Sequence, residues 1–374
     1  MTSTALNDPG FVKPSYDSAG FSSLPQRVIN LLTTHKYEVV VLIVVDGFGW
    51  RFFEKFQQHP FLEWVTRVGA VEKLTSQFPS TTAAHITTLH TGLPVGEHGI
   101  FEWNYYEPRL DAVITPLLFS YAGTTERDLL KRSGVSPRSI YPHGTIYNKL
   151  SNLGVKAHLF QHREYTPSTY SNAMFKGAHV QGYKTLPEGL VNLGETLAGV
   201  SSPAYLYLYF DKIDAVCHDY GPNAAQTLVE VETFLLVMEK IFRRYIHPVK
   251  KTLFLLTADH GQVEVDPTST IFINTDSRFS GVVDFLRTDS SGMPLVAGGS
   301  CRDFFLYIKK GRVEQAHSFL SSRLEGHAQV WRVEDMIMDG WFGPHISPAF
   351  RQRAGDLVIL PYRGESVWWY EKNR

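Results

Sequence analysis

Short apolar runs without polar alternation constrain the fold of this chain more than any other feature. They read VVVLIVV at 39–45, AYLYLYF at 204–210, TLFLLT at 252–257 and DLVILP at 356–361. Such strands are typically buried on both faces of a parallel sheet. Segments with helical spacing lie between them, such as 224–245, which carries basic residues in its last turn. The alternation predicts an α/β fold with a doubly wound, mostly parallel sheet and helices on both faces.

The domain organisation follows from length and local composition. The chain has 374 residues, which suits two domains or one enlarged α/β domain with insertions. Residues 1–23 are polar and rich in Pro and Gly, so we expect a loosely packed N-terminal arm before a main domain at 24–374. The stretch at about 265–333 has its own strand (303–308) and helix (313–324). It predicts a small inserted subdomain.

Charge and cysteine content exclude several classes of protein. Lys and Arg number 36 against 37 Asp and Glu, and no basic run predicts a nucleic-acid partner. Cys217 and Cys301 are too few for a disulfide framework, which favours a reducing compartment. The first residues lack the pattern of a signal peptide, and the longest apolar run is far shorter than the ~20 residues of a membrane span. We therefore expect a cytoplasmic protein that binds neither nucleic acid nor membranes.

Acidic or acid–imidazole groups follow the first three apolar runs. They are Asp46, the segment 211–218 and the adjacent pair Asp259 and His260. Ligands of open α/β sheets bind beyond the carboxyl ends of strands, so these groups can converge at one edge although they are distant in sequence. Convergence at this edge is the main structural expectation.

Each group also has a structural alternative. Asp46 before a glycine could form a plain turn, and Asp214 with His218, four residues apart, could be a surface ion pair. Adjacent Asp259 and His260 at a buried strand end are harder to explain in this way, because buried charges need partners. Asp and His side chains together suit zinc or a similar metal, with Asp214 preferred over Asp211 as a ligand.

The segment FPSTTAAH at 78–85 predicts a loop leading into the N-terminus of a helix. Free backbone N–H groups and the helix dipole favour a phosphate there. A hydroxyl at this position could attack phosphorus if a metal lowers its pKa. Alternatively, Ser80, Thr81 or Thr82 caps the helix.

Taken in order, the motifs VVDGFG, FPSTTAAHITTLHTGLPVGEHGI, DAVCH and TADHG resemble those of the alkaline phosphatase superfamily. The resemblance is to the nucleotide pyrophosphatase/phosphodiesterase branch, the type I phosphodiesterase family. It implies that residues 24–374 form a metal-dependent hydrolase of phosphoric esters that works through a covalent phosphothreonine. The nucleophile would be Thr82, three residues after the loop proline and nine before the Thr of the Thr-Gly pair, with Thr81 as the fallback. The resemblance places one metal ion on Asp46, Thr82, Asp259 and His260 and a second on Asp214 and His218. Zinc is the usual occupant, with manganese or iron as alternatives.

The resemblance is incomplete at two positions. Relatives complete the second metal site with a histidine near the C-terminus, often after the strand that corresponds to 356–361. His345 is a candidate, but it precedes that strand. Asn104 lies near the asparagine with which relatives bind a phosphate oxygen, one residue out of register.

The expected substrate is a small phosphate ester, such as a nucleotide. No arginine near the motifs could balance the second charge of a monoester, which favours diesters. Hydrolysis of monoesters or phosphonates, and a non-catalytic binding module that kept the fold, remain open. Aromatic residues after the Glu-His-Gly motif could stack on a flat leaving group, or they could fill a hydrophobic core. These are Phe101, Trp103, Tyr105 and Tyr106.

Overall fold

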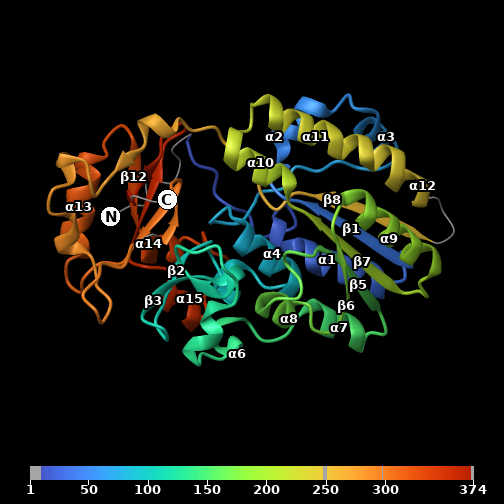
Figure 1. Ribbon diagram of the computed structural model, residues 1–374, viewed down its shortest axis with the longest axis horizontal. Helices are drawn as coiled ribbons and strands as arrows, with labels where there is room; N and C mark the ends of the chain where they lie inside the picture. The colour runs from blue at the N-terminus through green and yellow to red at the C-terminus, as the bar shows by residue number, and fades with distance from the viewer. Residues whose placement is uncertain (1–9, 247–250, 297, 372–374) are drawn as a thin grey trace.

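The protein is described from a computed structural model, which places residues 10–246, 251–296 and 298–371. A five-stranded sheet in the order β6-β5-β7-β1-β8 lies beside a smaller four-stranded sheet (Figure 1). Every pairing in the larger sheet is parallel. Its strands are β1 (Val39–Val45), β5 (Lys156–His162), β6 (His179–Tyr183), β7 (Ala204–Phe210) and β8 (Thr252–Thr257).

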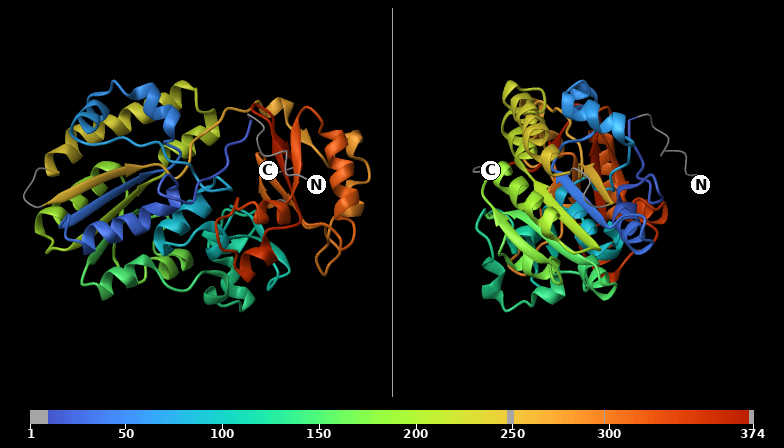
Figure 2. Two further views of the ribbon diagram at one scale, coloured as in Figure 1. Left: turned by 180° about the vertical axis from the view of Figure 1, so that it is seen from behind. Right: turned by 90° about the vertical axis from the view of Figure 1, so that its right-hand side faces the viewer.

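Helices cover both faces of the parallel sheet, as the unalternating apolar strands require. In β1, Val40, Leu42 and Val44 face one core, while the alternate valines and Ile43 face the other. The first core is covered by α1 (Leu24–Thr33), α4 (Thr82–Thr91), α7 (Ile146–Asn152) and α8 (Thr169–Met174). The second is covered by α2 (Trp50–Phe56), α3 (Pro60–Val68), α9 (Leu186–Gly199) and α11 (Ala225–Val237). The predicted doubly wound α/β fold is confirmed, and the views in Figure 2 show the same layers.

The smaller sheet is antiparallel and contains a strand that we expected in the larger one. Its order is β10 (Gly298–Ser300), β11 (Asp303–Leu306), β13 (Leu357–Pro361) and β12 (Ala328–Arg332). The prediction that 356–361 joins the parallel sheet is wrong, because β13 pairs antiparallel with β11 and β12. An apolar run shows that a strand is buried but not which strands lie beside it. The strand and helix expected at 303–308 and 313–324 are present as β11 and α13 (Val313–Arg323). The sheet extends past residue 333, and the domain boundaries themselves stay a prediction.

The described part of the N-terminal arm is packed rather than loose. The Tyr16 hydroxyl donates to the Trp341 carbonyl at 2.7 Å, and the Ser15 N–H donates to the Thr75 hydroxyl at 2.9 Å. Phe21 is buried in the first core. A few aromatic residues in a polar stretch are enough to fix it to the surface. Residues 1–9 lie outside the described residues.

The predicted helix at 224–245 is α11 continued by a π-helical turn, η4 (Met238–Phe242), and α12 (Arg243–Tyr245). No helix in the described ranges is long and apolar enough to cross a membrane. The other helices are η1 (Phe21–Ser23), α5 (Val95–His98), η2 (Pro116–Leu118), η3 (Leu129–Ser133), α6 (Pro137–Ile140), α10 (Lys212–Tyr220), η5 (Pro267–Ser269), η6 (Ser277–Phe279), η7 (Val282–Phe285), α14 (Val333–Met338) and α15 (Pro348–Arg353). The other strands are β2 (Tyr105–Glu107), β3 (Ala112–Thr115), β4 (Ser120–Tyr121), β9 (Ile271–Phe272) and β14 (Val367–Trp368).

Candidate active site

The predicted convergence of acidic groups follows from the strand register. β1 lies between β7 and β8, with Val45 opposite Phe210 and Val44 opposite Thr257. The three strands therefore end at one edge. Gly47 has φ +70°, which favours glycine, and a Cβ built on it would lie 3.1 Å from the Cβ of Asp214. The chain therefore turns sharply directly after β1, at Asp46 and Gly47.

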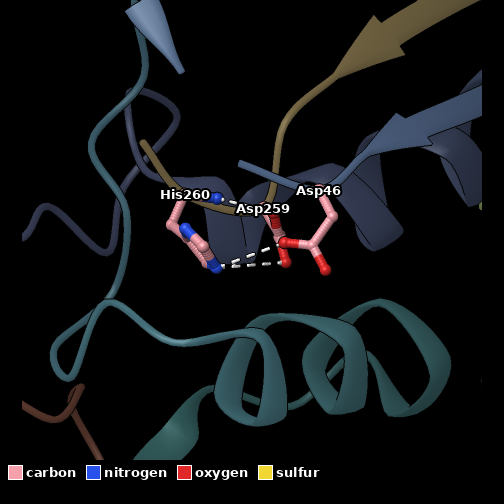
Figure 3. A group of neighbouring side chains, drawn as sticks. All are labelled: Asp46, Asp259 and His260. Carbon is pink, nitrogen blue, oxygen red and sulfur yellow. Dashed lines mark hydrogen bonds and ion pairs between the residues drawn. The ribbon is translucent and has the colours of Figure 1, made fainter. Parts of the chain in front are cut away.

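Asp46, Asp259 and His260 form one compact group at this edge, with their side chains converging from the ends of β1 and β8 (Figure 3). His260 Nε2 lies 3.3 Å from Asp46 Oδ1 and 3.7 Å from Asp259 Oδ2. One ligand atom from each residue can be chosen so that all lie within 4.8 Å of one another. Asp46 is 4% exposed and Asp259 is 1% exposed, so the carboxylates are withdrawn from water.

Thr82 presents its hydroxyl to this group from the first turn of α4. Its Oγ1 lies 3.1 Å from His260 Nε2 and 3.4 Å from Asp46 Oδ1. The N-cap is Thr81, whose side chain makes no capping hydrogen bond, and the Ser80 hydroxyl pairs with Ser76 at 2.9 Å. The alternative in which a hydroxyl of this loop only caps the helix is therefore not what the geometry shows.

A hydrogen bond orients the ring of His260. Nδ1 lies 3.0 Å from the Gly261 carbonyl, which can only accept, so Nδ1 carries a proton. The other ring nitrogen, Nε2, faces Asp46 and Thr82. An imidazole held by a carbonyl on its far nitrogen is the usual arrangement of a metal-ligating histidine.

The electrostatics of this group fit a cation. Burial raises the pKa of Asp46 well above its ordinary value, and the charges of Asp259 and Asp214 raise it further. Asp259 Oδ2 is buried and has no hydrogen-bond partner within the described chain. Crowded carboxylates with an orphaned oxygen and an available imidazole are a donor set suited to zinc or a similar divalent ion. The residues present therefore fit a metal ion.

Asp214 and His218 lie beside this group. His218 Nε2 is 3.3 Å from Asp214 Oδ2 across one turn of α10, as their spacing predicted. Burial alone would raise the pKa of Asp214, but hydrogen bonds from His218 and Gln262 and the nearby histidine charges hold the pKa below its usual value. Asp211 instead accepts hydrogen bonds from Tyr165 and Lys212. The preference for Asp214 over Asp211 agrees with this arrangement.

A buried polar network holds the Thr82 loop from behind. The Gln77 N–H donates to His85 Nε2 at 2.8 Å, so His85 Nδ1 donates to the Thr81 carbonyl, also at 2.8 Å. The Gln77 side chain donates to Thr88 at 2.9 Å and accepts from the Val95 N–H at 3.0 Å. Burial lowers the pKa of His85 to about 4, so the ring stays neutral and both its bonds persist. We did not predict this network, although Gln77 and His85 flank the loop motif.

Asn104 and His345 stay outside the group. The Asn104 side-chain oxygen accepts from the Thr115 hydroxyl at 2.7 Å, and its carbonyl accepts from the Gly299 N–H at 2.9 Å. His345 is exposed, and its carbonyl lies close to Gly96. Neither side chain bonds to the acidic group in the residues that the structure describes. Their roles stay predictions.

The aromatic residues after the Glu-His-Gly motif mostly fill the core. Phe101, Tyr105 and Tyr106 are buried, whereas Trp103 is 42% exposed. Glu102 is buried against Asp303 of β11; burial and then the charge of Asp303 raise the pKa of Glu102. Of the proposed stacking platform, only Trp103 is available to a ligand.

Two close contacts escaped the sequence analysis. The Tyr209 hydroxyl donates to Asp46 Oδ2, and Gln262 donates to Asp214 Oδ1. Tyr209 lies near the end of β7 and Gln262 follows β8, and only the register of the strands shows that they reach the two aspartates. Gly261, which follows His260, is not among the glycines with positive φ. The turn after β8 lies so close to the turn after β1 that a Cβ on Gly49 would collide with the Gly261 backbone.

Comparison with known proteins finds relatives among venom phosphodiesterases. Venom phosphodiesterase 2 of Crotalus adamanteus is 22% identical over 289 residues, covering 74% of this chain and 33% of the relative. The venom phosphodiesterase of Naja atra is 22% identical over 290 residues, covering 74% and 32%. The chain thus spans about a third of the length of these relatives.

Solved structures show the same fold. Murine ectonucleotide pyrophosphatase/phosphodiesterase 5 superposes with a TM-score of 0.64 at 14% identity, covering 90% of this chain and 82% of that one. An inactive variant of the murine protein, in complex with AMP, gives a TM-score of 0.65 at 14% identity, with the same coverage. The family model described as "Type I phosphodiesterase / nucleotide pyrophosphatase" matches residues 40–374. The chain belongs to the type I phosphodiesterase/nucleotide pyrophosphatase family, within the alkaline phosphatase superfamily.

Proposed function

We propose that this protein hydrolyses phosphodiesters of the nucleotide type, using Thr82 as a nucleophile beside two divalent metal ions. The observation that carries the proposal is the Thr82 hydroxyl at the N-terminus of α4, facing the buried group of Asp46, Asp259 and His260. A helix N-terminus, a hydroxyl and a metal-binding group at one edge are the components that phosphoryl transfer needs.

In this proposal, Asp46, Thr82, Asp259 and His260 hold one ion, and Asp214 and His218 hold the other. Zinc suits these donors best, with manganese or iron as alternatives. Bound ions would lower the pKa of the Thr82 hydroxyl and neutralise the charge on the phosphate oxygens. Tyr209 would orient Asp46 through its hydrogen bond to the second carboxylate oxygen.

The chain's own residues then perform a two-step displacement. Thr82 Oγ passes its proton to water and attacks phosphorus, forming the Oγ–P bond as the bond to the leaving oxygen breaks, and the leaving oxygen takes up a proton from water. Free N–H groups in the first turn of α4 bind the phosphate oxygens. Water then attacks the phosphothreonine, breaks the Oγ–P bond and restores the hydroxyl.

A nucleotide is the favoured substrate because AMP is bound to the related murine protein. We expect a diester rather than a monoester, since no arginine among the residues that the structure describes joins the Thr82 group to balance a second phosphate charge. The comparison of kcat/KM for bis-p-nitrophenyl phosphate and p-nitrophenyl phosphate tests this. A tenfold monoester preference, about 1.4 kcal/mol in transition-state binding, would overturn it.

Variants of the threonines test the nucleophile. Thr82→Ala should abolish turnover with metal content and fold retained, whereas Thr81→Ala should be milder, because the Thr81 side chain makes no capping bond. A phosphothreonine trapped by rapid acid quench should map to residue 82 by mass spectrometry. Loss of activity in Thr81→Ala alone would mean that the register is wrong.

Metal content separates an enzyme from a non-catalytic module. The purified protein should contain zinc, manganese or iron, and chelation should inactivate it reversibly. Full activity in excess chelator would disprove the two-metal mechanism, and an inert, metal-free protein would favour the binding module. The cytoplasmic location stays a prediction, to be tested by fractionation.

A further inference from the structure

Arg127 is a half-buried cation without an anionic partner. It lies in the loop between β4 and η3, with its guanidinium carbon 5.1 Å from the ring centroid of Tyr165. Its hydrogen bond to the Leu117 carbonyl is long, at 3.5 Å. No carboxylate of the described residues forms an ion pair with it. A partly exposed guanidinium that no carboxylate occupies is available to bind an anion from outside.

The position of Arg127 connects it to the candidate active site. The Tyr165 hydroxyl donates to Asp211, which directly follows β7. The Tyr165 ring centroid is 6.4 Å from that of Tyr209, and the Tyr209 hydroxyl donates to Asp46. Two neighbouring aromatic rings therefore separate the guanidinium from the candidate metal ligands, at the same edge of the sheet.

Lys212, a second cation near this edge, is already neutralised. Its ammonium lies 2.9 Å from Asp211 and 3.7 Å from Glu164. Arg127 differs because an aromatic face and one long hydrogen bond to a carbonyl support it, with no carboxylate of the described residues bound to it. Stacking on a ring fixes the plane of a guanidinium and leaves its N–H edge available, and that edge matches two oxygens of a phosphate. Because the guanidinium covers one face of the Tyr165 ring, a ligand at this position would meet a positive charge rather than that aromatic face.

We propose that Arg127 is a specificity-determining residue that binds an anionic group of the substrate other than the phosphate under attack. It would favour nucleotides that carry a further phosphate over diesters with a single charge. This inference rests on the proposed phosphodiesterase function, which places the scissile phosphate at Thr82.

The ratio of two specificity constants tests the proposal. We would measure kcat/KM for ATP and for the p-nitrophenyl ester of thymidine 5′-monophosphate, and divide the first by the second. Arg127→Gln should lower this ratio about tenfold, mainly by raising KM for ATP, because a charge-assisted bidentate bond is lost. Arg127→Lys should give an intermediate ratio, since charge remains but the planar fork does not. Arg109→Gln is the matched control, because Arg109 is already paired with Glu107 at 3.0 Å, and it should leave the ratio unchanged.

The outcomes distinguish this proposal from the proposed function. A ratio that stays within twofold in Arg127→Gln would overturn the proposal, and a lower melting temperature with that unchanged ratio would make Arg127 a structural residue. If the wild-type protein cleaves neither substrate, the proposed function fails. Calorimetry of ATP binding to the metal-loaded protein then tests whether Arg127 binds an anion. Affinity about tenfold weaker in Arg127→Gln would support the anion site, and equal affinity would reject it.

Discussion

Gly49 offers the sharpest test of how the candidate active site is assembled. A Cβ added to Gly49 would lie less than 3.0 Å from the Gly261 backbone, and real Cβ atoms essentially never approach other atoms so closely. Because carbon atoms pack at about 3.5–4.0 Å, the turn that carries Asp259 and His260 must move by roughly 1 Å in Gly49→Ala. Such overpacking costs about 1–3 kcal/mol, which is roughly 1–4 °C in melting temperature for a chain of this size. A shift of about 1 Å in ligating groups can cost about 100-fold in rate.

Gly261→Ala is the matched control for this variant. A Cβ on Gly261 would lie 3.5 Å from the Cα of Gly49, an ordinary contact, and its backbone needs no positive φ. We expect Gly49→Ala to lose bound metal and most activity, and Gly261→Ala to keep both. Metal analysis, thermal melting and kcat/KM on a diester would be measured for each. Equal metal content and activity in Gly49→Ala would refute the close approach of the two turns.

Three further perturbations have defined outcomes. Removal of metal with a chelator should lower the melting temperature, because an ion present at 100 to 1,000 times its Kd stabilises the folded state by about 2.7–4.1 kcal/mol; an unchanged melting curve would contradict metal binding. Burial raises the pKa of Glu102 and raises that of Asp303 to about 6. The protonated pair therefore contributes stability below the ordinary carboxyl pKa, and this contribution is lost as pH rises through the raised values. The free energy of unfolding of Glu102→Gln should rise relative to that of wild type between pH 5 and 8, by on the order of 1–3 kcal/mol in denaturant titrations. If the free energies of unfolding of the variant and the wild type changed with pH in parallel, the pair of Glu102 and Asp303 would not be the cause. Arg353 is 1% exposed and bonds Glu107 at 2.7 Å, so Arg353→Met should cost about 3–5 kcal/mol, because buried Glu107 keeps only Arg109 and the buried Gly99 and Ile140 carbonyls lose their donor. Arg351→Met, which removes an exposed pair, should cost less than about 1 kcal/mol.

The sequence predicted the parallel core and the convergence at its edge because both depend on local pattern and on a general property of parallel sheets. β1 matches its apolar run at 39–45, and Asp46 meets Asp259 and His260 because neighbouring strands end together. The spacing of residues within the loop motif favoured Thr82 over Thr81, and the Thr82 hydroxyl faces the acidic group.

What could not be predicted depends on tertiary placement. The run that forms β13 has the same apolar character as the parallel strands, and only pairing with β11 and β12 assigns it elsewhere. Arg127 has no local signal, since its importance arises from the ring on which it lies. The aromatic loop was ambiguous because stacking platforms and buried cores share a composition.

The core beneath α4 has a consequence for how the protein unfolds. Phe305 and Val358 of the second sheet belong to the same buried cluster as Val40 and Leu42 of the parallel sheet. Loss of this shared core removes contacts from both sheets at once, although each sheet also packs against a separate core on its other face. The two sheets should therefore melt in one cooperative transition, and their slowest-exchanging amide protons should report a single opening free energy.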